Sequence, residues 1–104
     1  MERKSHVRVG DVACRYGGEE FILIMPDASL EAARQRAEQL RQEAGDLRAQ
    51  EGDQFHGGIT LSLGVAIYPQ HGRTIETVLR AADAALYRAK QGGRNRVAAA
   101  EDAA

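Results

Sequence analysis

Two segments with the composition of β-strands flank the stretch Arg15-Tyr16-Gly17-Gly18-Glu19-Glu20-Phe21. The first strand is predicted at about Val12 to Tyr16 and the second at about Phe21 to Met25, where Pro26 ends it. Glycine accepts the positive φ values of tight two-residue turns, so the glycine pair predicts a β-hairpin. Two carboxylates beside a bare glycine turn suit a hard cation that lies next to a phosphate. The alternative is a solvated hairpin, in which the glutamates only keep the tip soluble.

The composition is that of one small globular domain. Of the 104 residues, 43% are hydrophobic and 28% are charged, which is ordinary for such a chain. The formal net charge of −1 gives no sign of attraction to nucleic acid or to an anionic membrane. Cys14 is the only cysteine, which excludes an intramolecular disulfide and a cysteine metal cluster. No apolar run approaches a membrane helix and Met1 to Asp11 has no signal-peptide core, so the expected location is cytoplasmic.

A periodic segment follows the hairpin. Its apolar residues recur at spacings of three and four, which predicts an amphipathic helix. These residues are Leu30, Ala33, Ala37, Leu40 and Ala44. Asp27 or Ser29 is suitably placed to cap the start of this helix, and Gly45 is expected to end it. Residues 46–58 are polar and show no periodicity, so they are expected to form a loop.

The second half of the chain contains its clearest strand. Apolar residues alternate with mostly small ones from Ile59 to Tyr68, so that one face of the strand would let a helix pack closely. Thr74 is expected to cap a second helix that ends at Gly92-Gly93, and residues 96–98 predict a short last strand. Residues 1–7 and 99–104 carry no packing signal and are expected to be disordered.

The order strand, strand, helix, strand, helix, short strand predicts an α+β fold, with both helices on one face of a mainly antiparallel sheet. A hairpin, a helix and a strand are also the last three parts of a ferredoxin-like split βαβ unit. In such a sheet a preceding strand runs centrally, between the hairpin and the strand at Ile59, and residues 1–7 are too short to supply it. Unpaired edges then predict a homodimer or strand-exchanged oligomer, or a fold that closes the gap by direct strand pairing.

Three segments resemble, in order, the GGDEF family of bacterial diguanylate cyclases. Gly17-Gly18-Glu19-Glu20-Phe21 resembles the family signature, and residues 60–66 resemble a later core strand. Residues 81–90 with Gly92-Gly93-Arg94-Asn95 resemble its last helix and phosphate-contacting end. The resemblance covers most of residues 8–98 and implies a nucleotidyl-cyclase palm-type fold.

The resemblance implies that two GTP molecules are condensed into the second messenger cyclic di-GMP. Each of two domains would hold one GTP, and each 3′-hydroxyl would attack the α-phosphate of the other nucleotide. Mg²⁺ or Mn²⁺ would neutralise the phosphate and help to activate the hydroxyl. By matching position, Glu19 is implied as a metal ligand and general base, and Glu20 as the second catalytic and metal-binding carboxylate.

Four further residues are implied to bind the substrate. Gly17 and Gly18 would leave room for the base and sugar, and Lys90 and Arg94 would hold the terminal phosphates. The alternative for Lys90 and Arg94 is that they are cations placed favourably at the C-terminus of a helix.

Arg8 and Asp11 stand where the family carries the Arg-x-x-Asp motif of its product-inhibition site. An arginine fork pairs with guanine O6 and N7 or with phosphate, and an aspartate accepts from guanine N–H groups. A plain surface ion pair is the alternative. Many inhibition sites add a further arginine from the next helix, for which the candidates are Arg34, Arg36 and Arg41.

The family's domains begin with a strand and two helices that precede the matched segment. That part carries an aspartate metal ligand and residues that recognise guanine. Residues 1–104 are therefore expected to be a single partial domain with weak metal binding, inactive when isolated. The alternative functions are a regulatory module that binds cyclic di-GMP and a dimerisation module without nucleotide chemistry.

Overall fold

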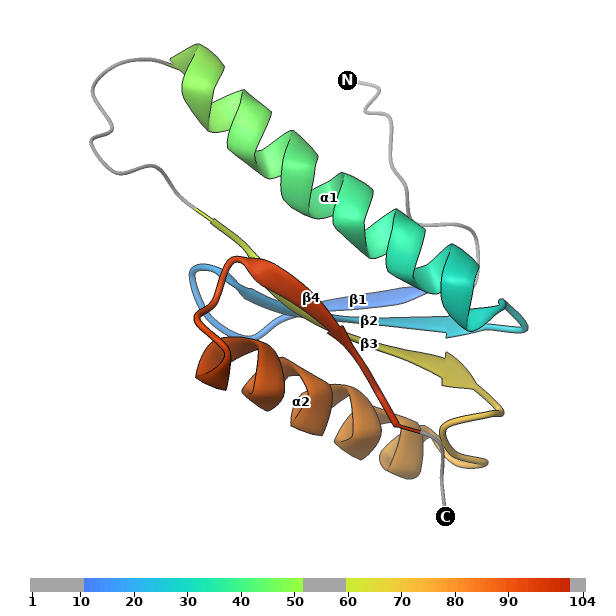
Figure 1. Cartoon of the computed structure of the whole chain (residues 1–104). Coiled ribbons are helices and arrows are strands. Elements are labelled where there is room, and N and C mark those ends of the chain that lie inside the picture. The colour runs from blue at the N-terminus through green and yellow to red at the C-terminus, as the bar shows by residue number, and fades with distance from the viewer. Residues whose placement is uncertain (1–10, 52–59, 102–104) are drawn as a thin grey trace.

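The computed structural model describes residues 11–51 and 60–101, which form one four-stranded sheet between two helices (Figure 1). In chain order the elements are β1 (Val12–Arg15), β2 (Glu20–Pro26), α1 (Leu30–Glu51), β3 (Ser62–Tyr68), α2 (Ile75–Gln91) and β4 (Arg96–Ala99). The strands lie side by side in the same order as in the chain. This confirms the predicted α+β class and element order. Neither α1 nor α2 is long and apolar enough to cross a membrane.

The sheet is mixed, so the prediction of a mainly antiparallel sheet was wrong. β1 pairs with β2 in antiparallel fashion and forms the predicted hairpin. β2 pairs with β3, and β3 with β4, in parallel. Because β2 and β3 pair directly along seven residue pairs, from Glu20↔Ser62 to Pro26↔Tyr68, the described chain closes the expected gap by direct strand pairing.

The two helices cover opposite faces of the sheet rather than one face as predicted (Figure 1). Alternate residues of β2 and β3 supply two separate cores. Those facing α2 are Ile22, Ile24 and Ala66, and those facing α1 are Leu23, Met25, Leu63, Val65 and Ile67. Since β2, β3 and β4 follow one another across the sheet, helices on opposite faces require parallel crossovers of opposite hand. One of them therefore departs from the usual right-handed rule.

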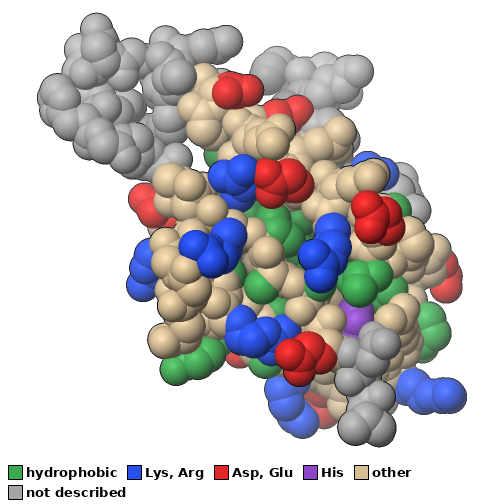
Figure 2. Space-filling model, in the orientation of Figure 1, with side chains coloured by type: hydrophobic (Ala, Val, Ile, Leu, Met, Phe, Trp, Pro, Cys, Tyr) green, Lys and Arg blue, Asp and Glu red, His purple; other side chains and the backbone are tan. Residues whose placement is uncertain are grey.

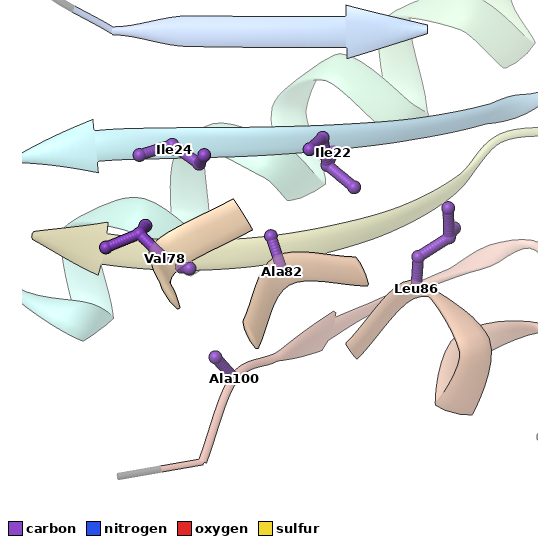
Figure 3. Packing of buried hydrophobic residues seen from close by; sticks show 7 residues of the cluster. Ile22, Ile24, Val78, Ala82, Leu86 and Ala100 are labelled. Atoms are coloured by element: carbon purple, nitrogen blue, oxygen red, sulfur yellow. The ribbon is translucent and has the colours of Figure 1, made fainter. Parts of the chain in front are cut away.

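The core between the sheet and α2 includes Ala100, the residue that follows β4 (Figure 3). Val78, Ala82 and Leu86 of α2 pack with Ala100, which is only 5% exposed. The Ala100 N–H donates to the Val65 carbonyl at 2.7 Å, and Ala99 belongs to β4. The prediction of an unpacked tail was therefore wrong for Ala99 and Ala100, whereas residues 1–7 and 102–104 lie outside the described residues.

A missing side chain at Gly64 lets α2 lie directly on β3. A Cβ atom at this position would lie 2.3 Å from the Ala82 carbonyl oxygen and 2.4 Å from the Leu86 nitrogen. Both are backbone atoms of the helix, which no rotamer change can move. The predicted close packing of a helix against the small-residue face of this strand is confirmed.

Both helices begin at the predicted caps. The Thr74 side chain accepts from the Thr77 N–H, and the Thr77 hydroxyl accepts from the Thr74 N–H, which makes a reciprocal capping box. The Ser29 hydroxyl accepts from the Ala32 N–H at 3.0 Å. The predicted starts of α1 and α2 were correct because each depends on hydrogen bonds between residues close in the sequence.

Two other boundaries differ from the prediction. α1 continues through Gly45 to Glu51, because a glycine costs a helix only about 1 kcal/mol relative to alanine and good helix formers follow it. β3 begins at Ser62, so the prediction of a strand was wrong for residues 60 and 61. Ile59, where the strand was predicted to begin, lies outside the described residues.

Gly64→Ala is expected to lower the free energy of unfolding by about 2–3 kcal/mol, because the methyl group would force α2 away from β3. Gly45→Ala is the matched control, since an added Cβ there meets no atom within 4 Å. It should raise the free energy of unfolding by about 0.5–1 kcal/mol through helix propensity. Urea denaturation followed by circular dichroism measures both. Equal effects of the two substitutions would contradict the close approach at Gly64.

Candidate active site at the β1–β2 turn

The turn between β1 and β2 lies at the edge of the sheet where the three parallel strands begin. Glu20 is paired with Ser62, and Ser62 with Arg96, so the first residues of β2, β3 and β4 are neighbours. α2 runs back from the far end of β3, which brings its C-terminal end and residues 92–95 to this edge (Figure 1). The topology thus joins the turn to the end of the last helix.

The turn is longer than the glycine pair alone. The Tyr16 N–H donates to the Glu20 carbonyl at 2.6 Å, and the Gly17 N–H donates to the same oxygen at 3.3 Å. Gly17 and Gly18 are not among the residues with positive φ. The hairpin is therefore confirmed, whereas the expected two-residue turn with positive φ at the glycines was wrong.

The two glycines leave different kinds of space. A Cβ atom on Gly17 would lie 3.3 Å from Glu20 Oε1, so this glycine makes room for the carboxylate within the turn. A Cβ atom on Gly18 would meet no atom within 4 Å, and Gly18 is exposed. Gly18 therefore offers bare backbone to a ligand at the tip of the turn.

The Glu20 carboxylate binds two cations from the end of α2. Its Oε1 accepts from Lys90 Nζ, and its Oε2 accepts from Arg94 Nη1, each at 3.2 Å. The Glu20 side chain keeps 25% of its surface exposed, against 30% for Lys90 and 57% for Arg94. The hydrogen bond from Lys90, followed by that from Arg94, lowers the pKa of Glu20 below its usual 4.5.

A left-handed backbone segment places Arg94 beside Glu20. Gly93, Arg94 and Asn95 have φ values of 120°, 65° and 50°. Residues with a side chain rarely adopt the left-handed region, although asparagine does so more readily than arginine. The Arg94 N–H donates to the Ala89 carbonyl at 2.9 Å, which ties this segment to the last turn of α2.

Glu19 differs from Glu20 in its surroundings. It is exposed at the turn, and no hydrogen bond or ion pair holds its carboxylate within residues 11–51 and 60–101. Its backbone is fixed, however, because its carbonyl accepts from the Ser62 N–H at 2.9 Å. Glu19 therefore presents a carboxylate to solvent from an anchored position.

A chain of hydrogen bonds supports this turn and was missed in the sequence. The Ser62 hydroxyl accepts from the Asn95 N–H at 3.2 Å, and Arg41 Nη1 donates to Asn95 Oδ1 at 2.7 Å. Ser62 is only 2% exposed, although it begins an otherwise apolar strand. A polar residue at the start of an apolar strand was the feature of the sequence that could have indicated this hydrogen bond. Arg41, a candidate for the inhibition site, is engaged here instead with Asn95 and Glu38.

The described residues offer an incomplete set of metal ligands. Within them, no three His, Cys, Asp or Glu side chains form a group that could hold a metal ion. Glu19 and Glu20 supply the carboxylates at the turn. Mg²⁺ in proteins is often held by one or two carboxylates together with substrate phosphates. The pair therefore fits a Mg²⁺ ion that is shared with a nucleotide, and not a site built by the protein alone.

Of the predicted product-inhibition pair, the structure describes only Asp11, which does not lie at this turn. Asp11 precedes β1 and so lies at the opposite end of that strand, and Arg8 lies outside the described residues. The inhibition site stays a prediction.

Charge on the visible face of the molecule is mixed. Lys and Arg side chains alternate with Asp and Glu side chains in Figure 2, and neither sign forms a continuous block on this face. The charge pattern of this face therefore does not mark a binding site by itself.

Comparison with known proteins identifies the family. A family model described as "Diguanylate cyclase, GGDEF domain" matches residues 3–96. The chain therefore belongs to the GGDEF domain family, as its resemblance predicted. It is 42% identical over 100 residues to response regulator PleD of Caulobacter vibrioides, covering 89% of the chain and 21% of that protein.

Two relatives are named as diguanylate cyclases. The chain is 45% identical over 96 residues to VdcA of Vibrio cholerae, covering 90% of the chain and 28% of the relative. It is 39% identical over 97 residues to DgcM of Escherichia coli, covering 93% of the chain and 22% of the relative. The chain thus spans between a fifth and a third of the length of these relatives.

The low pKa of Glu20 predicts how the site responds to acid. Because the pKa is lower in the folded protein, the ion pairs contribute fully to stability above about pH 4.5, and this contribution is lost as the pH falls through the lowered pKa. A ¹³C NMR titration of the Glu20 carboxyl should give a midpoint below 4.5. In Lys90→Met/Arg94→Met the midpoint should return toward that value. A midpoint that the double substitution leaves unchanged would show that these cations do not hold Glu20.

Proposed function

We propose that this domain is the catalytic unit of a diguanylate cyclase, which condenses two GTP molecules into cyclic di-GMP. The observation that carries the proposal is the contact of Glu20 with Lys90 and Arg94, 70 and 74 residues away in the sequence. It brings the GGDEF signature turn and two cations from the end of α2 to one place. An exposed carboxylate, bare backbone and paired cations are the parts that a metal–triphosphate site needs.

Each part of the nucleotide has a proposed place. The guanosine would lie against the exposed backbone of Gly18, where no side chain interferes, with Gly17 behind it. Lys90 would act as a point charge on the terminal phosphates, and the fork of Arg94 would bind two phosphate oxygens. The orientation of the triphosphate is then set by the two cations, which leaves the α-phosphate near the turn.

A divalent ion, Mg²⁺ or Mn²⁺, would be held by Glu19 and Glu20 together with phosphate oxygens. It would supply neutralisation of the phosphate charge, which otherwise repels an attacking oxygen. Because the described residues lack a third ligating side chain, we propose that metal binding to this chain is weak without nucleotide.

Glu19 would act as the general base. Its exposed carboxylate accepts the proton of a 3′-hydroxyl, whose oxygen then forms a bond to the α-phosphorus of the other GTP. The bond from that phosphorus to the α–β bridging oxygen breaks, and pyrophosphate leaves. The same transfer in the opposite sense closes the ring and releases a second pyrophosphate.

The reaction requires two domains, since each holds one GTP. We propose that they meet as a homodimer or a strand-exchanged oligomer in the cytoplasm, where GTP is available. Arg8 and Asp11 would bind the product, cyclic di-GMP. The 104-residue chain alone is expected to be inactive, because its two carboxylates bind metal weakly.

Glu19→Gln in the full-length protein should reduce the rate of cyclic di-GMP formation by about 10²–10⁴-fold, the usual contribution of a general base. The rate is measured by chromatography with GTP and Mg²⁺. Glu76→Gln is the matched control, because it removes the same charge from an exposed position at the opposite end of α2. Equal rates for Glu19→Gln and the parent would rule out the proposed chemistry.

A further inference from the structure

The two cations proposed to bind phosphate already hold a carboxylate. Glu20 Oε1 lies 3.2 Å from Lys90 Nζ, and Glu20 Oε2 lies 3.2 Å from Arg94 Nη1, so each carboxylate oxygen takes one cation. Two phosphate oxygens would make the same kind of charge-assisted hydrogen bonds. We infer that Glu20 is a resident anion in the phosphate site, which an incoming triphosphate must displace. This inference rests on the proposed function, because it takes Lys90 and Arg94 as the phosphate-binding groups.

The position of the cations explains why a resident anion is present. Lys90 lies in the last turn of α2 and Arg94 just beyond it, and both reach toward the same place on the turn. Two cations that converge without an anion repel each other, and the repulsion is weakened only in part by solvent. Glu20 supplies the opposite charge between them. Gly17 leaves the space that the carboxylate fills, since a Cβ atom there would lie 3.3 Å from Oε1.

Displacement gives the Glu20 carboxylate a second use. Once phosphate oxygens hold Lys90 and Arg94, the carboxylate is released at the turn beside Glu19. There it would be available as an oxygen ligand for a divalent cation, which would neutralise phosphate charge. Triphosphate and metal therefore favour the same arrangement, and each should raise the affinity for the other by the same factor. Without metal, Glu20 only competes with the phosphate.

A purely structural role for Glu20 makes the opposite prediction. If the ion pairs serve only to fix α2 against the hairpin, their loss would loosen Lys90 and Arg94 and weaken phosphate binding. If Glu20 is a competitor, its loss leaves the two cations to the phosphate, and binding becomes tighter. The sign of the change in affinity therefore separates the two roles.

The test is the affinity of the 104-residue chain for inorganic tripolyphosphate, measured by calorimetry at low salt with a chelator present. Glu20→Gln should bind tripolyphosphate about fivefold to tenfold more tightly than the parent chain, because the competing charge is gone. Glu19→Gln is the matched control. It removes the same charge from the same turn without releasing the cations, and should change the affinity by no more than about twofold.

A measurement without substitutions gives a second test. During a tripolyphosphate titration of the parent chain, the ¹³C signal of the Glu20 carboxyl and the side-chain ¹⁵N signal of Arg94 should shift with one common midpoint. This result holds even if Glu20→Gln fails to fold, which circular dichroism would show. A shift of the Arg94 signal while the Glu20 signal stays fixed would overturn the inference.

The outcomes separate this inference from the proposed function. Unchanged or weaker binding by Glu20→Gln, or an equal gain in both glutamine variants, overturns the resident-anion role alone. The phosphate site itself then still stands, provided that Lys90→Met/Arg94→Met loses tripolyphosphate binding. If the parent, Glu19→Gln and Glu20→Gln all fail to bind tripolyphosphate, both the inference and the proposed phosphate site are overturned.

Discussion

The direct contact of α2 with β3 at Gly64 is the constraint on which the site depends. A side chain at this position would meet backbone atoms of α2, so the helix reaches its observed height over the sheet only because Gly64 has none. The height of the helix fixes where its last turn emerges, and with it the positions of Lys90 and Arg94. Their 3.2 Å contacts with Glu20 leave little room for a displaced helix. A packing requirement in the core thus sets the geometry of a polar site at the sheet edge.

The site lies at an electrostatically unfavourable end of the fold for binding an anion. Open α/β sheets commonly bind ligands at the carboxyl ends of their strands, where helix N-termini attract phosphate. Here the strands β2, β3 and β4 begin at the site and α2 ends there, so the helix presents carbonyl oxygens with partial negative charge. In the proposed function, attraction for phosphate must therefore come from side chains. Lys90 and Arg94 would supply it, with Glu20 as the carboxylate that balances them.

The sequence predicted what depends on local interactions and on the family signature. The hairpin, the cap at Thr74 and the small face of β3 are local features, and Glu19, Glu20, Lys90 and Arg94 were indicated by resemblance to the family. Parallel pairing of β2 with β3 was not predicted because it depends on contacts far apart in the chain. The unbroken apolar run from Phe21 to Met25 is typical of a strand buried on both faces, but the prediction of both helices on one face did not take it into account. The bonds of Glu20 to Lys90 and Arg94 required the folded structure.

The central claim is that the signature turn and the end of α2 form one nucleotide site. Paramagnetic broadening of backbone amide signals by Mn²⁺–GTP tests it most directly, because the metal would lie within reach of both segments. The account predicts that residues 17–20 and 92–95 broaden together, while residues 69–73 at the other end of the 17-residue helix α2 stay sharp. Broadening of only one of the two segments, or of residues 69–73 instead, would contradict it.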